Sequence, residues 1–162
     1  MRLELTRRGD YAVRAMLALA RAGAASPRGR PSGDGRLSVA RIAVSEAIPP
    51  RILPSVMRLL TRAGLVDAQT GRTGGYRLAR RADEISLLDI IEAVEGDIRR
   101  RSCILRGGPC VANGECAVHG VFASAEAALR DSLAKATLAG AAAAPWPERP
   151  SASAWRQPRG PS

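Results

Sequence analysis

The sequence predicts a mainly α-helical fold with one small β-hairpin and a long helix near its C-terminal end. Residues 37–63 have the pattern of two short helices separated by a turn, and residues 65–79 that of two short strands joined by a glycine-rich tip. This order of helix, turn, helix and hairpin is that of a winged helix-turn-helix domain. An apolar pattern of helical period then continues for about twenty residues up to residue 136, longer than the core of so short a chain requires.

A first helix is expected over residues 7–22, with Thr6 as its N-cap. Its apolar side chains recur at helical spacing while its arginines lie off that stripe, so the helix is expected to be amphipathic. Residues 23–36 contain too many glycines and prolines for regular structure and are expected to form a surface loop. The apolar stripe of the helix consists of Val13, Met16, Leu17 and Ala20.

The two helices of the helix-turn-helix are predicted from their caps and their apolar spacing. Ser38 is the expected N-cap of the first helix, and a turn with two prolines ends it. The second helix is expected over residues 51–63, with Pro54 in the first turn, where a missing N–H loses no hydrogen bond. The buried stripe of the second helix is expected to be Leu53, Val56, Met57 and Leu60.

The opposite side of that second helix carries a hydroxyl and three guanidinium groups at helical spacing, and the hairpin adds two more arginines. Such side chains can simply be solvated, but in a winged helix-turn-helix they favour contact with double-stranded DNA. We expect some of them to face bases and the others to contact phosphates. The base-facing residues are Arg51, Ser55 and Arg58, and the phosphate-facing residues are Arg62, Arg72 and Arg77.

The formal charge of +10 is concentrated in the first half of the chain. Residues 1–80 hold fifteen arginines and five acidic residues, whereas basic and acidic residues balance over 81–162. A polyanion such as DNA or RNA is the commonest partner of such a surface, although a genomic preference for arginine gives a similar composition. No stretch is apolar and long enough for a membrane span and no secretory signal is visible, so a cytoplasmic protein is expected.

Beyond the hairpin, Ser86 and Asp89 have the spacing of a capping box that opens a helix ending at Glu95. The long helix that follows has an apolar stripe that a domain of this size does not cover by itself, so a homodimer is expected. From Gly140 the chain has no period and is expected to be disordered. The expected segments are a DNA-binding domain at 1–80, a cluster-binding loop and dimerisation helix at 81–139, and a tail at 140–162. The stripe consists of Val118, Val121, Phe122, Ala125, Leu129, Leu133 and Ala136.

The three cysteines and the single histidine of the chain, Cys103, Cys110, Cys116 and His119, lie within seventeen residues of one another. Thiolates and a neutral imidazole are soft ligands, and a segment rich in glycine, proline and asparagine can fold around an ion. An iron–sulfur cluster and a zinc ion both suit such donors. The spacing contains no Cys-x-x-Cys pair of the kind that thiol oxidoreductases use, so an enzyme is not expected.

Several stretches taken together resemble the Rrf2 family of bacterial transcriptional regulators, over residues 1–139. They are residues 3–16, 48–66, 71–80 and 84–96, with the three cysteines. The resemblance implies a dimeric winged-helix protein whose second helix of the helix-turn-helix enters the major groove, whose wing touches the minor groove, and whose long helix crosses to the partner. Members with three cysteines in this loop commonly hold an iron–sulfur cluster there, so the expected function is a regulator, in the first instance a repressor, controlled by a cluster.

The resemblance offers two candidate residues for the fourth ligand of a cluster, and an exogenous ligand or no fourth ligand stays open beside them. His119 follows Cys116 at the i, i+3 spacing of one helical face, which is similar to members with a two-iron cluster. Asp10 falls where other members donate an aspartate from the second subunit to a four-iron cluster. A surface histidine and a carboxylate favoured by the helix dipole are the ordinary explanations of the same two residues.

The chain departs from the family pattern in two places. Six residues separate Cys103 from Cys110, where five are expected, and this difference leaves the type of cluster open. The Cys116 and His119 arrangement favours a two-iron cluster, with a four-iron cluster and a zinc ion as alternatives. Pro54 stands where a polar residue that reads bases often lies, which leaves the operator sequence open. The alternative functions are a zinc- or thiol-based winged-helix regulator without a cluster and a metal-free protein-interaction module.

Overall fold

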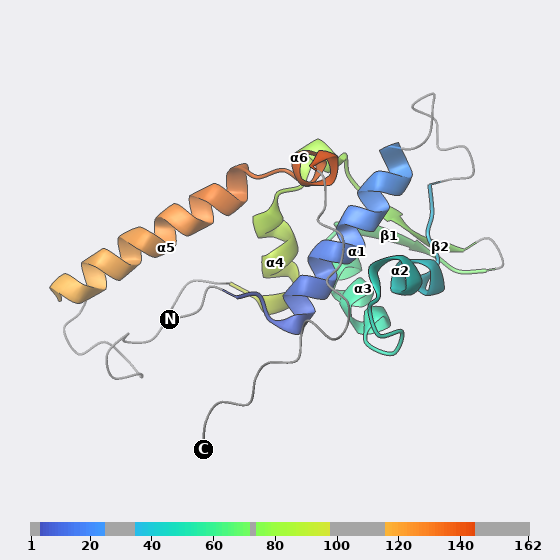
Figure 1. Ribbon diagram of the computed structural model, residues 1–162, viewed down its shortest axis with the longest axis horizontal. Coiled ribbons are helices and arrows are strands. Elements are labelled where there is room, and N and C mark those ends of the chain that lie inside the picture. Colours follow the sequence, from blue (N-terminus) through green and yellow to red (C-terminus); the bar gives the residue numbers. More distant parts are fainter. Residues whose placement is uncertain (1–3, 25–34, 72–73, 98–115, 145–162) are drawn as a thin grey trace, which may run out of the picture.

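The computed structural model describes residues 4–24, 35–71, 74–97 and 116–144 (Figure 1). The described elements form a mainly helical domain with one two-stranded antiparallel sheet. In chain order they are α1 (Arg7–Ala24), α2 (Val39–Glu46), α3 (Leu53–Arg62), β1 (Val66–Gln69), β2 (Gly75–Leu78), the 3-10 helix η1 (Ala82–Glu84), α4 (Leu87–Glu95), α5 (Ala117–Lys135) and α6 (Leu138–Ala143).

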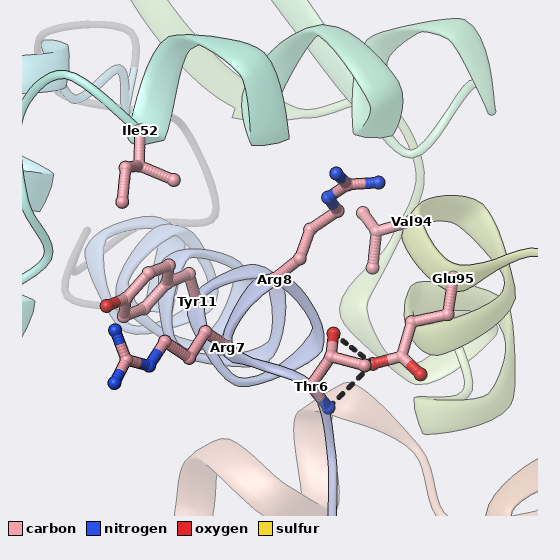
Figure 2. Close-up of a pocket in the computed structure, with 7 residues that line it drawn as sticks. All are labelled: Thr6, Arg7, Arg8, Tyr11, Ile52, Val94 and Glu95. Atoms are coloured by element: carbon pink, nitrogen blue, oxygen red, sulfur yellow. Dashed lines mark hydrogen bonds between the residues drawn. The ribbon is translucent and has the colours of Figure 1, made fainter.

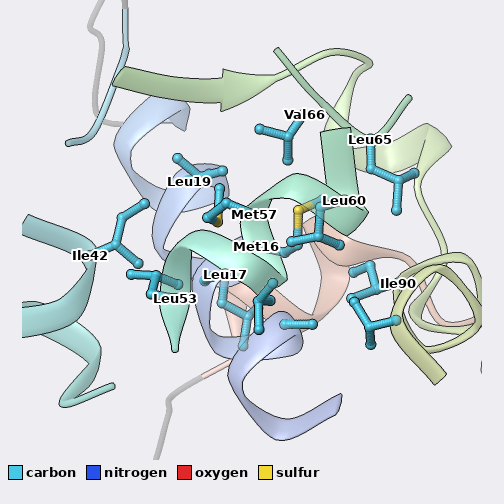
Figure 3. Packing of buried hydrophobic residues seen from close by; sticks show 14 of the residues in the cluster. Met16, Leu17, Leu19, Ile42, Leu53, Met57, Leu60, Leu65, Val66 and Ile90 are labelled. Atoms are coloured by element: carbon cyan, nitrogen blue, oxygen red, sulfur yellow. The ribbon is translucent and has the colours of Figure 1, made fainter. Parts of the chain in front are cut away.

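Helix α1 is the centre of the fold, and α2, α3, α4, α6 and β2 all pack against it. The predicted stripe is only part of its buried surface, because Ala12, Ala15 and Leu19 are also buried. Val13 of the predicted stripe is only partly buried. The small alanine side chains let neighbours approach on more than one side, so α1 is buried over more than the single amphipathic face that was expected. Figure 3 shows the core around Met16, Leu17 and Leu19, with side chains from α3, β1 and α4 closing over them.

The helix-turn-helix forms largely as its caps predict. The Ser38 side chain accepts a hydrogen bond from the backbone N–H of Arg41 at 3.2 Å and begins α2. Ala47 ends α2 in the left-handed region, with φ of 41°, which is a conformation that usually requires glycine. Helix α3 begins at Leu53, two residues later than expected, so Arg51 lies in the preceding turn and not on the helix. Pro54 lies in the first turn, as predicted.

The buried stripe of α3 is confirmed, and the wing continues from it. The four predicted residues of the stripe are fully buried, and β1 and β2 follow with Val66 opposite Leu78 in an antiparallel register. Leu37 pairs with Tyr76 on the other side of β2, so the residue just before the N-cap of α2 extends the sheet. Gly75 lies at this crossing, where an added Cβ would be 2.8 Å from the Leu37 carbonyl oxygen. A larger residue would push the two segments apart.

Helices α4 and α6 complete the core that α1 organises. The capping box of α4 is present, with Ser86 and Asp89 each bonding the other's backbone N–H. Leu138, the first residue of α6, is fully buried, and its N–H bonds the Ile85 carbonyl oxygen at 2.7 Å. The predicted boundaries at 80 and 140 therefore do not separate packing units: residues on both sides share one core, and α6 runs to Ala143, past the expected start of the tail.

Helix α5 projects from this domain before the chain returns to it as α6 (Figure 1). No residue of α5 whose exposure is described is buried. Val118 and Val121 are exposed, while Phe122, Leu129 and Leu133 are half-buried. Within the described parts of the chain, no helix is long and apolar enough to cross a membrane.

Candidate nucleic-acid interface and metal-binding residues

Helix α3 presents the polar and basic face that its spacing predicts. Ser55, Arg58 and Arg62 are exposed on the side opposite to the buried stripe. The Ser55 hydroxyl donates a hydrogen bond of 2.7 Å to the Ile52 carbonyl oxygen, so its proton is used inside the first turn and its oxygen can only accept from a ligand. Arg51 is exposed as well, but it extends this surface from the turn before the helix.

The wing places Arg77 directly opposite Asp67 on the neighbouring strand. The Arg77 guanidinium donates to the Asp67 carboxylate at 3.3 Å, and both side chains are about half exposed. Ion pairs as exposed as this one contribute about 0–1 kcal/mol, so breaking the pair with Asp67 costs little. Arg72, predicted at the tip of the wing, lies outside the described residues.

The exposed side of α2 adds two residues that the sequence reasoning did not single out. Arg41 is exposed, and Val44 one turn later is 82% exposed. In a helix-turn-helix the first helix crosses the nucleic-acid backbone, which makes the exposed Arg41 a further candidate for a phosphate contact. The spacing of Arg41 and Val44, at i and i+3, places them on one side of the helix, away from the buried residues Ile42 and Ala43, and could have indicated this exposed side.

The first turn of α5 carries two of the predicted metal ligands. Cys116 is the N-cap of the helix and is half-buried, and His119 is exposed three residues later. Cys103 and Cys110 lie outside the described residues. The described part of the chain holds no group of three potential metal ligands, which is expected when two of the four candidates lie elsewhere. A soft thiolate and an imidazole at this spacing fit an iron–sulfur cluster or a zinc ion by donor chemistry.

Asp10, the alternative ligand, lies in the first turn of α1 and is bound to Arg14. Both carboxylate oxygens accept from that guanidinium, one of them from Nε at 3.0 Å. Arg14 also donates to the Glu46 carbonyl oxygen at 3.0 Å and lies over the ring of Tyr11. Asp10 would therefore have to leave an arginine held by three groups before it could bind a metal. Opposite charges at i and i+4 of a helix commonly form an ion pair, so the sequence alone could have predicted the pair of Asp10 and Arg14.

The last residue of α4 is bonded to the beginning of α1. Glu95 Oε1 accepts from the backbone N–H of Thr6 at 3.1 Å and from its hydroxyl at 2.8 Å (Figure 2). The Thr6 hydroxyl oxygen in turn accepts from the Gly9 N–H at 3.2 Å, which confirms Thr6 as the predicted N-cap. A cleft of about 540 Å³ opens beside this contact, lined by Thr6, Arg7, Arg8, Tyr11, Ile52, Val94 and Glu95.

A second contact at this end of α4 involves α5. Arg130 pairs with Glu92 of α4 and, at 3.5 Å, with Asp97 just beyond α4. All three side chains are between 24% and 29% exposed, so the guanidinium and both carboxylates are partly shielded from water. The end of α4 is thus attached to α1 through Glu95 and to α5 through Arg130. No local pattern in the sequence indicates either contact.

The fold and these surfaces agree with one protein family. The model of the Rrf2 family, described as an iron-dependent transcriptional regulator, matches residues 5–144. The chain belongs to the Rrf2 family. It is therefore a transcriptional regulator and not an enzyme, and regulation of transcription implies that this Rrf2 protein binds DNA.

Three similar proteins illustrate the range of the family. The HTH-type transcriptional regulator NsrR of Shouchella clausii is 30% identical over 137 residues, which span 84% of this chain and 86% of NsrR. The structure of CymR, the global cysteine regulator of B. subtilis, matches 87% of this chain and 97% of its own, with 27% identity and a TM-score of 0.66. The structure of T. potens IscR matches 86% of this chain and 85% of its own, with 27% identity and a TM-score of 0.63. These likenesses confirm the winged-helix fold that the order of elements predicts.

Proposed function

We propose that this Rrf2 protein is a homodimeric cytoplasmic repressor whose affinity for its operator depends on an iron–sulfur site at the start of α5. The observation that carries the proposal is the placement of Cys116 at the N-cap of α5 and of the exposed His119 three residues later, in a segment that also contains Cys103 and Cys110. Similarity to NsrR and IscR supports the same assignment. A bound cluster would supply redox chemistry and reactivity toward nitric oxide, so the signal is redox state, nitric oxide or iron–sulfur status.

Cys103, Cys110 and Cys116 would hold the cluster with one further ligand. His119 is favoured as that ligand because its side chain is exposed next to Cys116, whereas both oxygens of Asp10 are bound to Arg14. A cysteine and histidine set favours a two-iron cluster. A four-iron cluster is the alternative if Asp10 leaves Arg14 and binds from the partner subunit.

DNA would be bound by the exposed face of α3, by the turn before it and by the wing. In a dimer, the two α3 helices have to reach major grooves separated by about 34 Å, so a change in the angle between subunits changes operator affinity. The apolar stripe of α5 is the proposed contact between subunits, since the domain covers it only in part. Ser55, Arg58 and Arg51 would face bases, and Arg62, Arg72 and Arg77 would contact phosphates.

The cluster is tested by the anaerobic absorption and resonance Raman spectra of freshly purified protein, together with iron, sulfide and zinc analysis. We expect a coloured protein with iron and sulfide in equal amounts. In the matched ligand variants, His119→Ala should change the spectrum and Asp10→Ala should leave it unchanged. The opposite pattern would assign Asp10, and colourless protein with stoichiometric zinc would rule out the cluster.

A zinc- or thiol-based regulator is the second candidate, supported by the similarity to CymR, which is a cysteine regulator. Its fold is as similar to this chain as that of IscR, so the fold alone does not separate the two candidates. Under this alternative, the same cysteines would respond to oxidation or bind zinc without iron. A metal-free interaction module would show no steep dependence of DNA affinity on salt, whereas several phosphate contacts require one.

A further inference from the structure

The contact between Glu95 and Thr6 joins the last residue of α4 to the N-cap of α1. Glu95 supplies the carboxylate that accepts the Thr6 N–H and hydroxyl, so a residue of α4 completes the cap of α1 across 89 positions of sequence. A negative charge at the N-terminal end of a helix is favoured by the helix dipole. The Thr6 hydroxyl continues the chain of hydrogen bonds to Gly9. The first turn of α1 is therefore tied to the last residue of α4.

Gly9 is the part of this arrangement that local structure does not explain. It lies inside α1, where alanine would be more favourable by helix propensity, and its φ is not in the left-handed region. A Cβ at Gly9 would lie 2.1 Å from Glu95 Oε1, which is too close for the carboxylate to remain. Glycine at this position leaves the space that the Glu95 carboxylate occupies.

The two ends of this contact belong to the two parts of the molecule that a regulator must connect. On one side, Glu95 is followed within two residues by Asp97, which pairs with Arg130 of α5, and the segment with Cys103 comes next. On the other side, the first turn of α1 shares a cleft with Ile52, the residue before α3 (Figure 2). Helix α1 also packs directly on α3.

We propose that Glu95 is a positioning residue for operator binding, which holds the first turn of α1 and so aligns α3 with the end of α4. This inference rests on the proposed function for the signal that it transmits. A displacement of the end of α4 would reach α3 through Glu95, Thr6 and the first turn of α1. Without the carboxylate, α1 and α3 would remain packed on α4, but the first turn of α1 would no longer be tied to the last residue of α4.

The test uses variants that break or keep the contact in matched pairs. Glu95→Ala removes the carboxylate and Gly9→Ala displaces it, whereas Glu95→Gln and Thr6→Ser keep an acceptor and a donor in place. Operator affinity is measured by fluorescence anisotropy for each full-length protein, reconstituted with ferrous iron and sulfide and again without them. Hydrogen exchange of the α3 amides is measured on the cluster-free proteins. Each affinity ratio compares two forms of one variant, so a uniform loss of stability cancels.

Couplings between sites usually change affinity about 5- to 150-fold. We expect the operator affinities of the reconstituted and cluster-free forms to differ by a factor in that range for the wild type, Glu95→Gln and Thr6→Ser. For Glu95→Ala and Gly9→Ala we expect a ratio within about twofold of one and faster exchange in α3. Wild-type ratios and unchanged α3 exchange in these two variants would overturn the inference. A wild-type ratio of one would contradict the proposed cluster control instead, and the exchange rates in α3 would then decide the role of Glu95 by themselves.

Discussion

Helices α1 and α5 are almost equal in length, at 18 and 19 residues, and both are rich in alanine, but one is buried and the other largely exposed. Eight residues of α1 are buried beneath neighbours on several sides, whereas no described side chain of α5 is buried. The comparison shows that an apolar helical pattern predicts that a helix face is covered. It does not predict whether the same domain or another subunit covers it. For α1 the partner is the rest of the domain, and for α5 we propose a second subunit.

The largest expected effect concerns the burial of α6 against α1, after the chain has passed through α5. Leu138→Ala should lower the free energy of unfolding by about 2–5 kcal/mol, because it leaves a cavity under α6 where the side chain is fully buried. Leu133→Ala is the matched control on α5, where the leucine is half-buried. Urea unfolding of both variants, at concentrations low enough to keep each protein monomeric, measures the difference. Equal losses would contradict the contrast between the two helices.

A somewhat smaller effect concerns the face of α3 that we propose to contact DNA. Arg58→Ala should weaken operator binding by about 1–3 kcal/mol and relax the preference at one base position, because the residue is exposed at the centre of the α3 face. Arg62→Ala should weaken binding to operator and random DNA alike. Anisotropy titrations with both duplexes check this. An equal loss on both duplexes for Arg58→Ala would remove its base-reading role.

The proposed partner of α5 is tested by a charge placed on its stripe. Val121→Glu should weaken the dimer by tenfold or more, about 1.4 kcal/mol, because a carboxylate would be buried between two apolar surfaces. Ala127→Glu introduces the same charge on the opposite side of α5, where the side chain is exposed, and should leave the dimer unchanged. Sedimentation equilibrium measures both. The same dimer affinity in the two variants would show that this stripe is not the interface.

The smallest expected effect is a gain in stability within the α1-centred domain. Ala47 ends α2 with φ of 41°, where an L-residue with a Cβ is strained. Ala47→Gly should raise the free energy of unfolding by about 0.5–1 kcal/mol, since the relief of strain exceeds the added freedom of the unfolded chain. A thermal or urea transition checks it. A loss of stability would show that the strain is compensated elsewhere.

The sequence predicts those features whose causes lie within a few residues of one another. The caps at Ser38 and Ser86, the buried stripe of α3 and the order of elements depend on local spacing, and all of them are confirmed. Helix α3 begins two residues later than the sequence predicts, because the turn that precedes it contains residues that are also acceptable in a helix.

Features that depend on distant residues could not be predicted in this way. Glu95 meets Thr6 only because α4 packs against α1, and Leu138 is buried only because the chain returns from α5 to that core. For the candidate metal site, the residue types in the sequence predict which side chains could be ligands. The structure adds their surroundings: Asp10 is bound to Arg14, whereas His119 is exposed.

The central claim is that occupancy of the site at the start of α5 sets the affinity of α3 for DNA. The most direct test is anaerobic fluorescence anisotropy of one operator duplex, titrated with the reconstituted protein and with the same preparation after removal of iron, at one fixed salt concentration. We expect affinities that differ by about fivefold or more, together with a steep dependence on salt in the tighter-binding form. Equal affinities of the iron-loaded and iron-free proteins would contradict the claim.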